Sequence, residues 1–448
     1  MVSSKGVANS KIDDDDGGGD KLMRKVLGLG FSVQGFRCFP WLVVSFFLKD
    51  GLNVNPSTLQ ILLSSANLPM VGKPLYGLVS DSVYISGQHR VPYIAFGAFL
   101  QALSWLAIAI SPSSISVFTI SIYLLLSNLG ASITEVGNDA IVAEMGKQPP
   151  SSTKHSQQPS SSGNLQSFVW IASSVGGVAG NLLGGIFISR LSPQSMFMFF
   201  GLLVALQFFI TISIRESSLG LPKNPSIGIK KQLSELSAAL RKPKIAYSIS
   251  WFALSYAVVP LLNGTMFFYQ TQYLKIDSSV LGISKVFGQA TMLLWGVIYN
   301  RYLKSISPRK LISAIQATIA FLMISDVLFV RGFYRQMGVP DTLYVVIFSG
   351  FLEVLFFFKF LPFTVLLAQL CPQGCEGSIM AFLMSAVALA FIVSGYLGVA
   401  LASYIKITGS DFSGLSLGLV IQASCTLLPI FWSSCIPEYV KTKDKRKD

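Results

Sequence analysis

Hydrophobic runs of about 20 residues recur from Leu27 almost to the end of this 448-residue chain. Each run can cross a hydrocarbon layer roughly 30 Å thick as a helix, because a helix rises about 1.5 Å per residue. Only 12% of the residues are charged, against about 25% in soluble domains. Twelve runs meet this criterion: 27–48, 57–80, 91–110, 114–142, 164–188, 195–214, 245–270, 278–299, 310–330, 342–370, 377–403 and 411–435.

The runs favour helices over the strands of a membrane β-barrel. A barrel strand alternates apolar and polar residues over about ten positions, whereas "VLFFFKFLPFTVLLAQL" does not alternate. The sequence therefore predicts an all-α membrane protein with twelve transmembrane helices.

The order of polar and apolar segments predicts two similar halves. Residues 1–26 are predicted to be a disordered cytosolic tail, 27–214 a bundle of six helices, 215–244 a linker with a short amphipathic helix, 245–435 a second six-helix bundle and 436–448 a basic cytosolic tail. Gly72 and Gly288 are 216 residues apart, and the dipeptide "EV" at 135 recurs at 353. These matching offsets indicate a repeat, an arrangement in which a substrate site forms between the halves.

The formal charge of +13 is interpreted as a signal of membrane topology. With both termini in the cytosol, 24 of the 34 Lys and Arg residues fall on the cytosolic side and six on the other, as the positive-inside rule requires. The expected surroundings are a lipid bilayer, and no nucleic-acid partner is predicted. The first 26 residues resemble neither a cleavable signal nor a transit peptide. Plasma membrane, vacuolar membrane and chloroplast envelope all stay open.

Enzymatic chemistry has little support in the sequence. The five cysteines lie in or beside the hydrophobic runs and form no paired framework, and both histidines lie in polar segments. We therefore expect no metal site, no cofactor and no catalytic triad. The chain also has no GxxxxGK[ST] motif for a nucleotide, so an enzyme is not expected.

The stretch "GKPLYGLVSD" at 72–81 places Gly72, Gly77 and Asp81 at the end of the second run, and Arg90 comes just before the third. This pattern resembles the loop motif between helices 2 and 3 of the major facilitator superfamily. The resemblance implies a gating latch, in which Asp81 faces the start of helix 11.

Helix 11 is expected to begin near Gly377 and Ser378, which are the proposed partners of Asp81 in the latch. A helix N-terminus carries about half a positive charge and free N–H groups, so it attracts a carboxylate. The alternative is an ordinary surface pair of Asp81 with Arg90.

Several further motifs occur in one order: "SVQGFRCFPWLVVSFFLKDGL", "LPMVGKPLYGLVSD", "GQHRVPYI", "EVGNDAIVAE" and "GNLQSFVWIASSVGG". Together they resemble the folate–biopterin transporter family within that superfamily. The resemblance implies a secondary transporter that moves pteridines by alternating access. It is dense over the first five helices and looser beyond them.

Eight ionisable residues lie inside the predicted helices, four of each sign, which predicts pairing because an unpaired charge at mid-membrane is costly. They are Arg37, Lys73, Lys285 and Lys359 with Glu135, Asp139, Asp326 and Glu353. The superfamily resemblance implies that helices 1, 4, 7 and 10 line the cavity, so Arg37, Glu135, Asp139, Glu353 and Lys359 are the candidate substrate-binding and coupling residues.

Two roles compete for these charges. Arg37 either binds an anionic substrate through its planar fork or neutralises an acid. Glu135 and Asp139 either exchange protons during transport or form structural pairs. The acid that pairs with Lys73 is not evident from the sequence.

The leading hypothesis is a transporter of small anionic pteridines that acts as a monomer. Coupling to protons stays open. The alternatives are a transporter of another small organic solute and a non-transporting receptor with the same fold.

Overall fold

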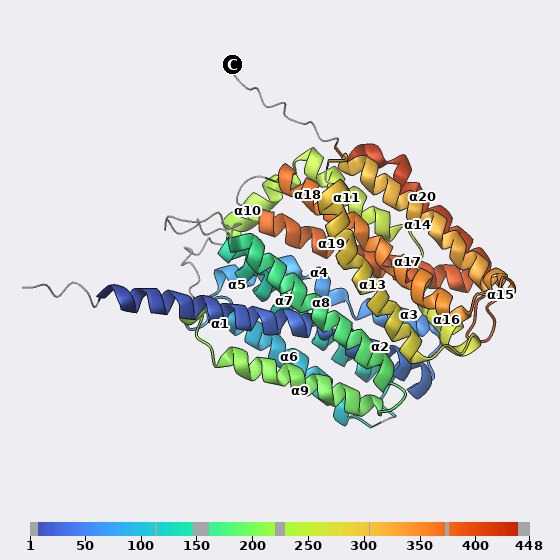
Figure 1. Cartoon of the computed structure of the whole chain (residues 1–448), viewed down its shortest axis with the longest axis horizontal. Coiled ribbons are helices and arrows are strands. Elements are labelled where there is room, and N and C mark those ends of the chain that lie inside the picture. The colour runs from blue at the N-terminus through green and yellow to red at the C-terminus, as the bar shows by residue number, and fades with distance from the viewer. Residues whose placement is uncertain are drawn as a thin grey trace, which may run out of the picture. The chain divides into compact units, whose positions relative to one another are not determined.

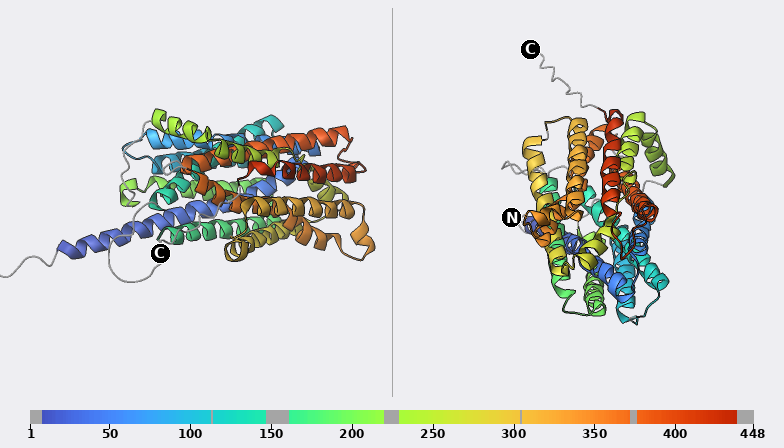
Figure 2. Two further views of the ribbon diagram at one scale, coloured as in Figure 1. Left: turned by 90° about the horizontal axis from the view of Figure 1, so that it is seen from above. Right: turned by 90° about the vertical axis from the view of Figure 1, so that its right-hand side faces the viewer.

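The computed structural model describes residues 8–112, 114–146, 161–219, 229–303, 305–371 and 376–437. Within these ranges the chain forms helices joined by turns, and the β pairing is limited to one isolated bridge between Ile85 and Gln88. The prediction of an all-α protein is confirmed. Within each half of the chain, several long helices run alongside one another (Figure 2).

Nine helices in the described ranges are long and apolar enough to cross a membrane. The other three predicted spans are helical but interrupted or short. The run 57–80 is interrupted at residues 66–67 and at Gly72, each time shortly before a proline, and the run 245–270 is interrupted at 258–262 around Pro260. Proline cannot continue the helical hydrogen bonds. The last run is the 17-residue helix α20 (Leu415–Phe431).

The N-terminal segment differs from the prediction. Helix α1 begins at Ala8, so residues 8–26, predicted to be disordered, are helical, while residues 1–7 lie outside the described ranges.

The chain divides into two compact units, and the first comprises residues 1–54 and 65–233. Its long helices pack as neighbours, α6 against α7 and α9, and α1 against α8 (Figure 1). The helices are α1 (Ala8–Phe36), α2 (Cys38–Phe46), α4 (Leu68–Val71), α5 (Lys73–Ser82), α6 (Val91–Ile110), α7 (Val117–Gly146), α8 (Ser161–Phe187) and α9 (Pro193–Ile212), with the 3-10 turn η2 (Glu216–Leu219).

The second unit comprises residues 55–64 and 234–448. Helix α14 packs against α20, α11 against α19, and α13 against α17. The helices are α3 (Pro56–Ser65), α11 (Pro243–Ala257), α12 (Asn263–Phe268), α13 (Ser278–Ile298), α14 (Pro308–Val330), α15 (Phe333–Gln336), α16 (Asp341–Tyr344), α17 (Gly350–Leu355), α18 (Phe360–Leu370), α19 (Glu376–Tyr404) and α20, with the π and 3-10 segments η3 (Tyr269–Tyr273), η4 (Tyr299–Leu303), η5 (Val345–Ser349), η6 (Phe356–Lys359) and η7 (Ser433–Cys435).

The division between the units differs in one respect from the predicted bundles. Helix α3 lies within the span 27–214 but belongs to the second unit, where Gln60 donates to the carbonyl oxygens of Leu261 (2.6 Å) and Gly395 (2.7 Å). The other change of unit falls at residues 233–234, inside helix α10 (Ile229–Leu240), the helix expected in the linker. The basic tail from residue 438 onward lies outside the described ranges.

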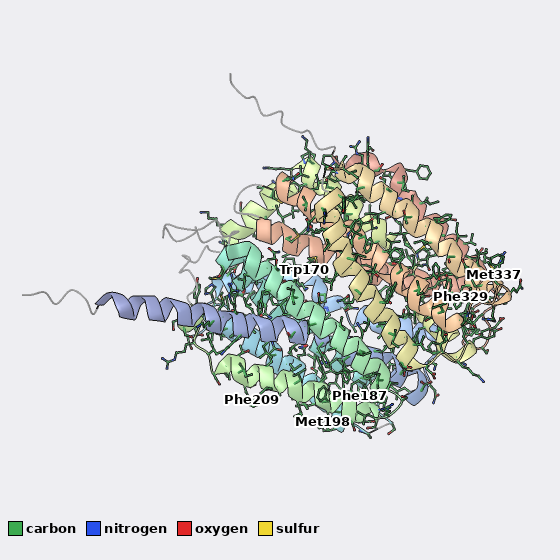
Figure 3. All side chains as sticks on the ribbon, viewed as in Figure 1. Trp170, Phe187, Met198, Phe209, Phe329 and Met337 are labelled. Carbon is green, nitrogen blue, oxygen red and sulfur yellow. The ribbon has the colours of Figure 1, made fainter. Side chains whose placement is uncertain are left out.

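Many large apolar side chains are exposed on the helices. Phe209 on α9 and Trp170 on α8 are both more than half exposed (Figure 3). A soluble monomer seldom leaves extended apolar surface in contact with water, so these side chains indicate contact with lipid.

Candidate functional site

Three charged residues of the first unit meet at one point. Arg37 lies at the junction of α1 and α2 and pairs through Nη1 with Glu135 of α7. Lys73 Nζ, at the start of α5, lies 2.7 Å from the other carboxylate oxygen of Glu135. The acid that pairs with Lys73, left open by the sequence, is therefore Glu135.

A hydrogen-bonded asparagine holds the Arg37 side chain in place. Arg37 Nη2 donates to Asn128 Oδ1 at 2.7 Å, and Asn128 Nδ2 donates to the carbonyl oxygen of Ala66 at 2.6 Å. Asn128 and Glu135 are seven residues apart on α7, which places them two turns apart on one face. Two cations thus share a single largely buried carboxylate, so the group carries a net positive charge that suits an anion.

Asp139 lies one turn after Glu135 on α7, and its side chain is exposed. Within the described residues no hydrogen bond or ion pair to its carboxylate is found, although the charges of Lys73 and Glu135 act on it. Arg37, Glu135 and Asp139 are thus brought into one region, and Asp139 is the acid without a direct partner.

Glu353 and Lys359 of the second unit do not share one site. Glu353 on α17 is 55% exposed and lies 2.6 Å from Lys285 of α13. Lys285 therefore has an acidic partner. Another acid of this unit, Asp326 on α14, is buried and accepts a hydrogen bond from the Tyr344 hydroxyl at 3.0 Å.

The Lys359 side chain is fully buried inside the second unit. Its ammonium group donates to Gln316 Oε1 at 2.7 Å and to Ser255 Oγ at 3.1 Å, and lies 3.9 Å from the centre of the Tyr256 ring. Every one of these partners is neutral. The ammonium group therefore makes a cation–π contact inside the helix bundle and does not face an open cavity.

A second cluster of charges surrounds Arg90, which immediately precedes α6 in the first unit. Arg90 pairs with Asp81, and its Nη2 and Nε lie 2.5 and 3.0 Å from Glu144 Oε1 on α7. It also donates to Ser80 Oγ at 2.7 Å. This buried arginine connects α5, α6 and α7. We call the residues Ser80, Asp81, His89, Arg90, Glu144 and Glu216 the Arg90 cluster.

Glu216 caps the start of α6 within this cluster. Its Oε2 accepts hydrogen bonds from the backbone N–H groups of His89 (3.0 Å), Arg90 (2.8 Å) and Val91 (3.1 Å). A carboxylate in this position satisfies free N–H groups and interacts with the helix dipole. Glu216 Oε1 lies 2.6 Å from His89 Nδ1, so η2 is tied to the first turn of α6.

The pKa values of this pair shift in opposite directions. The carboxylates of Glu144 and Glu216 outweigh burial and raise the pKa of His89 from 6.5 to about 9. Burial alone would raise the pKa of Glu216, but the hydrogen bonds from His89 and the backbone lower it from 4.5 to about 2. His89 is therefore protonated and Glu216 ionised near neutral pH.

The residues assigned to the latch occupy the expected elements. Gly72 separates α4 from α5, and a Cβ added at Gly77 would lie 3.7 Å from Val136 of α7. Gly377 and Ser378 lie in the first turn of α19. The alternative pairing of Asp81 with Arg90 is present, while the latch between Asp81 and helix α19 stays a prediction.

Sequence reasoning missed the partners of these residues. Asn128 and Glu144 lie seven residues before Glu135 and nine after it on α7, and helical spacing could have marked Asn128 as facing the same way as Glu135. Glu216 is 126 residues from Arg90, and no local pattern connects the two.

Comparison with solved structures shows which fold the chain has. A nucleoside transporter superposes with a TM-score of 0.68 at 13% identity, over 92% of this chain and 99% of that one. A D-xylose–proton symporter superposes with a TM-score of 0.66 at 16% identity, over 93% and 98%. The chain shares the fold of these transporters, and its long apolar helices make it an integral, multi-pass membrane protein.

The sequence comparisons then show the family. The family model described as "BT1 family" matches residues 34–448, and the chain belongs to this family. It is 64% identical to the "Probable folate-biopterin transporter 7" of Arabidopsis thaliana, over 95% of each chain. It is 27% identical to the "Folate-biopterin transporter" of a Synechocystis strain, over 93% of this chain and 83% of that one. The resemblance drawn from the motifs is confirmed.

Proposed function

We propose that the chain is a secondary-active transporter of folate-like or biopterin-like pteridine anions, working by alternating access. The observation that carries this proposal is the shared carboxylate of Glu135, which leaves the group of Arg37 and Lys73 with one excess positive charge. An anionic substrate can take the guanidinium fork of Arg37 while Lys73 stays with Glu135. The names of the relatives agree with this class of substrate.

The test is uptake of labelled folate, biopterin and unrelated solutes by vesicles that contain the purified protein. Arg37→Gln should reduce uptake of an anionic pteridine about 10-fold to 100-fold, since a hydrogen bond to a charged group contributes about 1.5–3 kcal/mol. Arg335→Gln is the matched control, because that arginine forms an exposed pair with Asp341. If the vesicles take up another class of solute and no pteridine, the proposed substrate is wrong.

Asp139 is the proposed proton-coupling residue. It has no direct partner among the described residues, whereas Glu135 is held by two cations. Asp139→Asn should therefore abolish uptake driven by a proton gradient and preserve exchange of internal for external substrate. Gradient-driven uptake at the wild-type rate would contradict the assignment.

Both termini are proposed to face the cytosol, because the basic residues are concentrated on that side of the predicted topology. Accessibility of single cysteines placed in the terminal segments to an impermeant thiol reagent tests this orientation in sealed cells. Relatives of 44% and 43% identity carry the word "chloroplastic" in their names. The location of a fluorescent fusion should therefore be compared with markers of the chloroplast envelope, the plasma membrane and the vacuolar membrane.

A further inference from the structure

A small cavity with about 10 Å³ of space for water lies in the first unit, between α1, α6, α7 and α9, which is room for about one water molecule. Its wall combines apolar surface with an unusual number of polar side chains. The lining residues are Gly30, Val33, Gln34, Arg37, Gln101, Ala131, Thr134, Glu135, Asn138 and Gln207. Four of them carry side-chain amides, and the pair of Arg37 with Glu135 lies at its edge.

Several of these amide atoms are buried without a hydrogen-bond partner in the described protein. They are Gln34 Oε1, Gln101 Oε1 and both Oδ1 and Nδ2 of Asn138. Asn138 is only 1% exposed and Gln101 only 3% exposed. A buried amide that makes no hydrogen bond is strongly disfavoured, so four such atoms around one cavity indicate an occupant.

We infer that this cavity is a binding site for ordered water. The Asn138 side chain determines which occupant fits, because its acceptor oxygen and its N–H donor are both unpaired. The occupant must donate a hydrogen bond to one atom and accept one from the other. Water does both, whereas a metal cation can contact only the oxygen and a halide only the N–H group. Exchanging the two amide atoms of Asn138 leaves this requirement unchanged.

The charges at the edge of the cavity also oppose a cation. Arg37 and Lys73 contribute two positive charges against the one carboxylate of Glu135. Buried waters typically make about three hydrogen bonds to otherwise unpaired groups, and the lining supplies that number of partners. Water at this site supplies hydrogen bonds to the amides next to the Arg37–Glu135 pair.

The substitution Gly30→Ala tests the site. A Cβ at this position would lie 2.7 Å from Asn138 Nδ2, so alanine pushes the amide into the space assigned to water. Gly28, half a turn earlier on α1, is the matched control, since its Cβ would instead meet the Phe168 ring at 3.0 Å.

The first experiment is a structure of the full-length wild-type chain at a resolution that shows ordered solvent. We expect a density peak about 2.7–3.2 Å from the amide atoms of Asn138. In Gly30→Ala that peak should weaken or disappear, and in Gly28→Ala it should stay. A wild-type map without a peak at Asn138 would overturn the inference.

The second experiment measures thermal unfolding of the same proteins in detergent. If water occupies the cavity, Gly30→Ala displaces bonded water and should unfold at a lower temperature than Gly28→Ala. A dry cavity predicts the opposite order, because alanine fills space and has a higher helix propensity than glycine. A dependence of wild-type unfolding on Na⁺ or Cl⁻ that is lost in Asn138→Leu would assign the site to an ion instead. None of these readouts depends on which substrate is transported.

Discussion

Replacing Glu216 with glutamine should reduce both the stability of the first unit and its dependence on pH. The carboxylate caps α6 through three backbone N–H groups and pairs with His89. Glutamine keeps one acceptor oxygen but loses the charge that interacts with the helix dipole and with the imidazolium. The perturbation is therefore electrostatic and nearly isosteric.

The magnitude follows from the pKa of His89. A rise from 6.5 to about 9 corresponds to about 3 kcal/mol of stabilisation of the protonated form. Glu144 and Glu216 share this effect, and solvent near the loop screens it, so we assign about 1–2 kcal/mol to Glu216. The lowered pKa of Glu216 reflects the same interaction from the other partner and is not added.

The sign of the pH dependence differs at the two ends of the range. Because the pKa of His89 is raised, its stabilisation is complete below pH 6.5 and is lost as the pH rises through about 9. Because the pKa of Glu216 is lowered, its contribution is present above pH 4.5 and is lost as the pH falls toward about 2. Wild-type stability should therefore fall between pH 6.5 and 9.

The assay is thermal unfolding in detergent at pH 6 and pH 9. For a unit of about 200 residues, 1–2 kcal/mol corresponds to roughly 3–6 °C. The wild type should lose more than this difference between the two pH values, and Glu216→Gln should lose clearly less while starting lower at pH 6. Asp50→Asn is the control, since that acid forms an exposed pair with Lys49. An unchanged pH dependence in Glu216→Gln would refute the reasoning.

Three further predictions concern other parts of the molecule. Asp81→Ala should slow transport while the protein stays folded and monodisperse in gel filtration; wild-type turnover would remove the reason for a latch. Lys359→Met should leave the unfolding temperature unchanged or raised, since removing a buried charge that lacks a counter-ion avoids its desolvation cost; a large decrease would show that its neutral partners stabilise it. Gly35→Ala should reduce the yield of folded protein, because its Cβ has no room beside the Ser173 carbonyl of α8. Gly296→Ala has nothing within 4 Å of its Cβ and should gain about 1 kcal/mol of stability from the higher helix propensity of alanine. Equal yields of the two variants would contradict the close packing of α1 on α8.

The periodicity and length of the apolar runs were sufficient to predict the fold class, because a membrane allows few architectures and each span carries its own signal. The interruptions were less visible. Pro69, Pro74 and Pro260 are readable in the sequence, yet whether a proline bends a helix or ends it depends on the helices packed around it. The placement of α3 in the second unit rests on Gln60 and its contacts, and no local pattern contains that information.

The candidate site was predictable in its residue types and only in part in its pairs. Glu135 and Asp139 share a helix face by their spacing, and Arg37 was expected near them. Their partners come from separate helices: Lys73 lies 62 residues from Glu135, and Glu216 lies 127 residues from His89. Such contacts follow from the packing of whole helices, and a single sequence does not specify that packing.

Four cations and four acids inside the helices suggest four pairs, but the structure distributes them unequally. Glu135 takes two cations, Lys285 pairs with Glu353, and Asp326 is bonded to a tyrosine. Asp139, Asp326 and Lys359 are left without a counter-ion among the described residues. Such a group can gain or lose a proton without leaving a partner charge unpaired, whereas neutralising Glu135 would leave two partly buried cations unbalanced. Of the acids predicted to act in coupling, Asp139 is therefore the one whose protonation can change at the lowest cost, and this is why its replacement by asparagine should separate driven uptake from exchange.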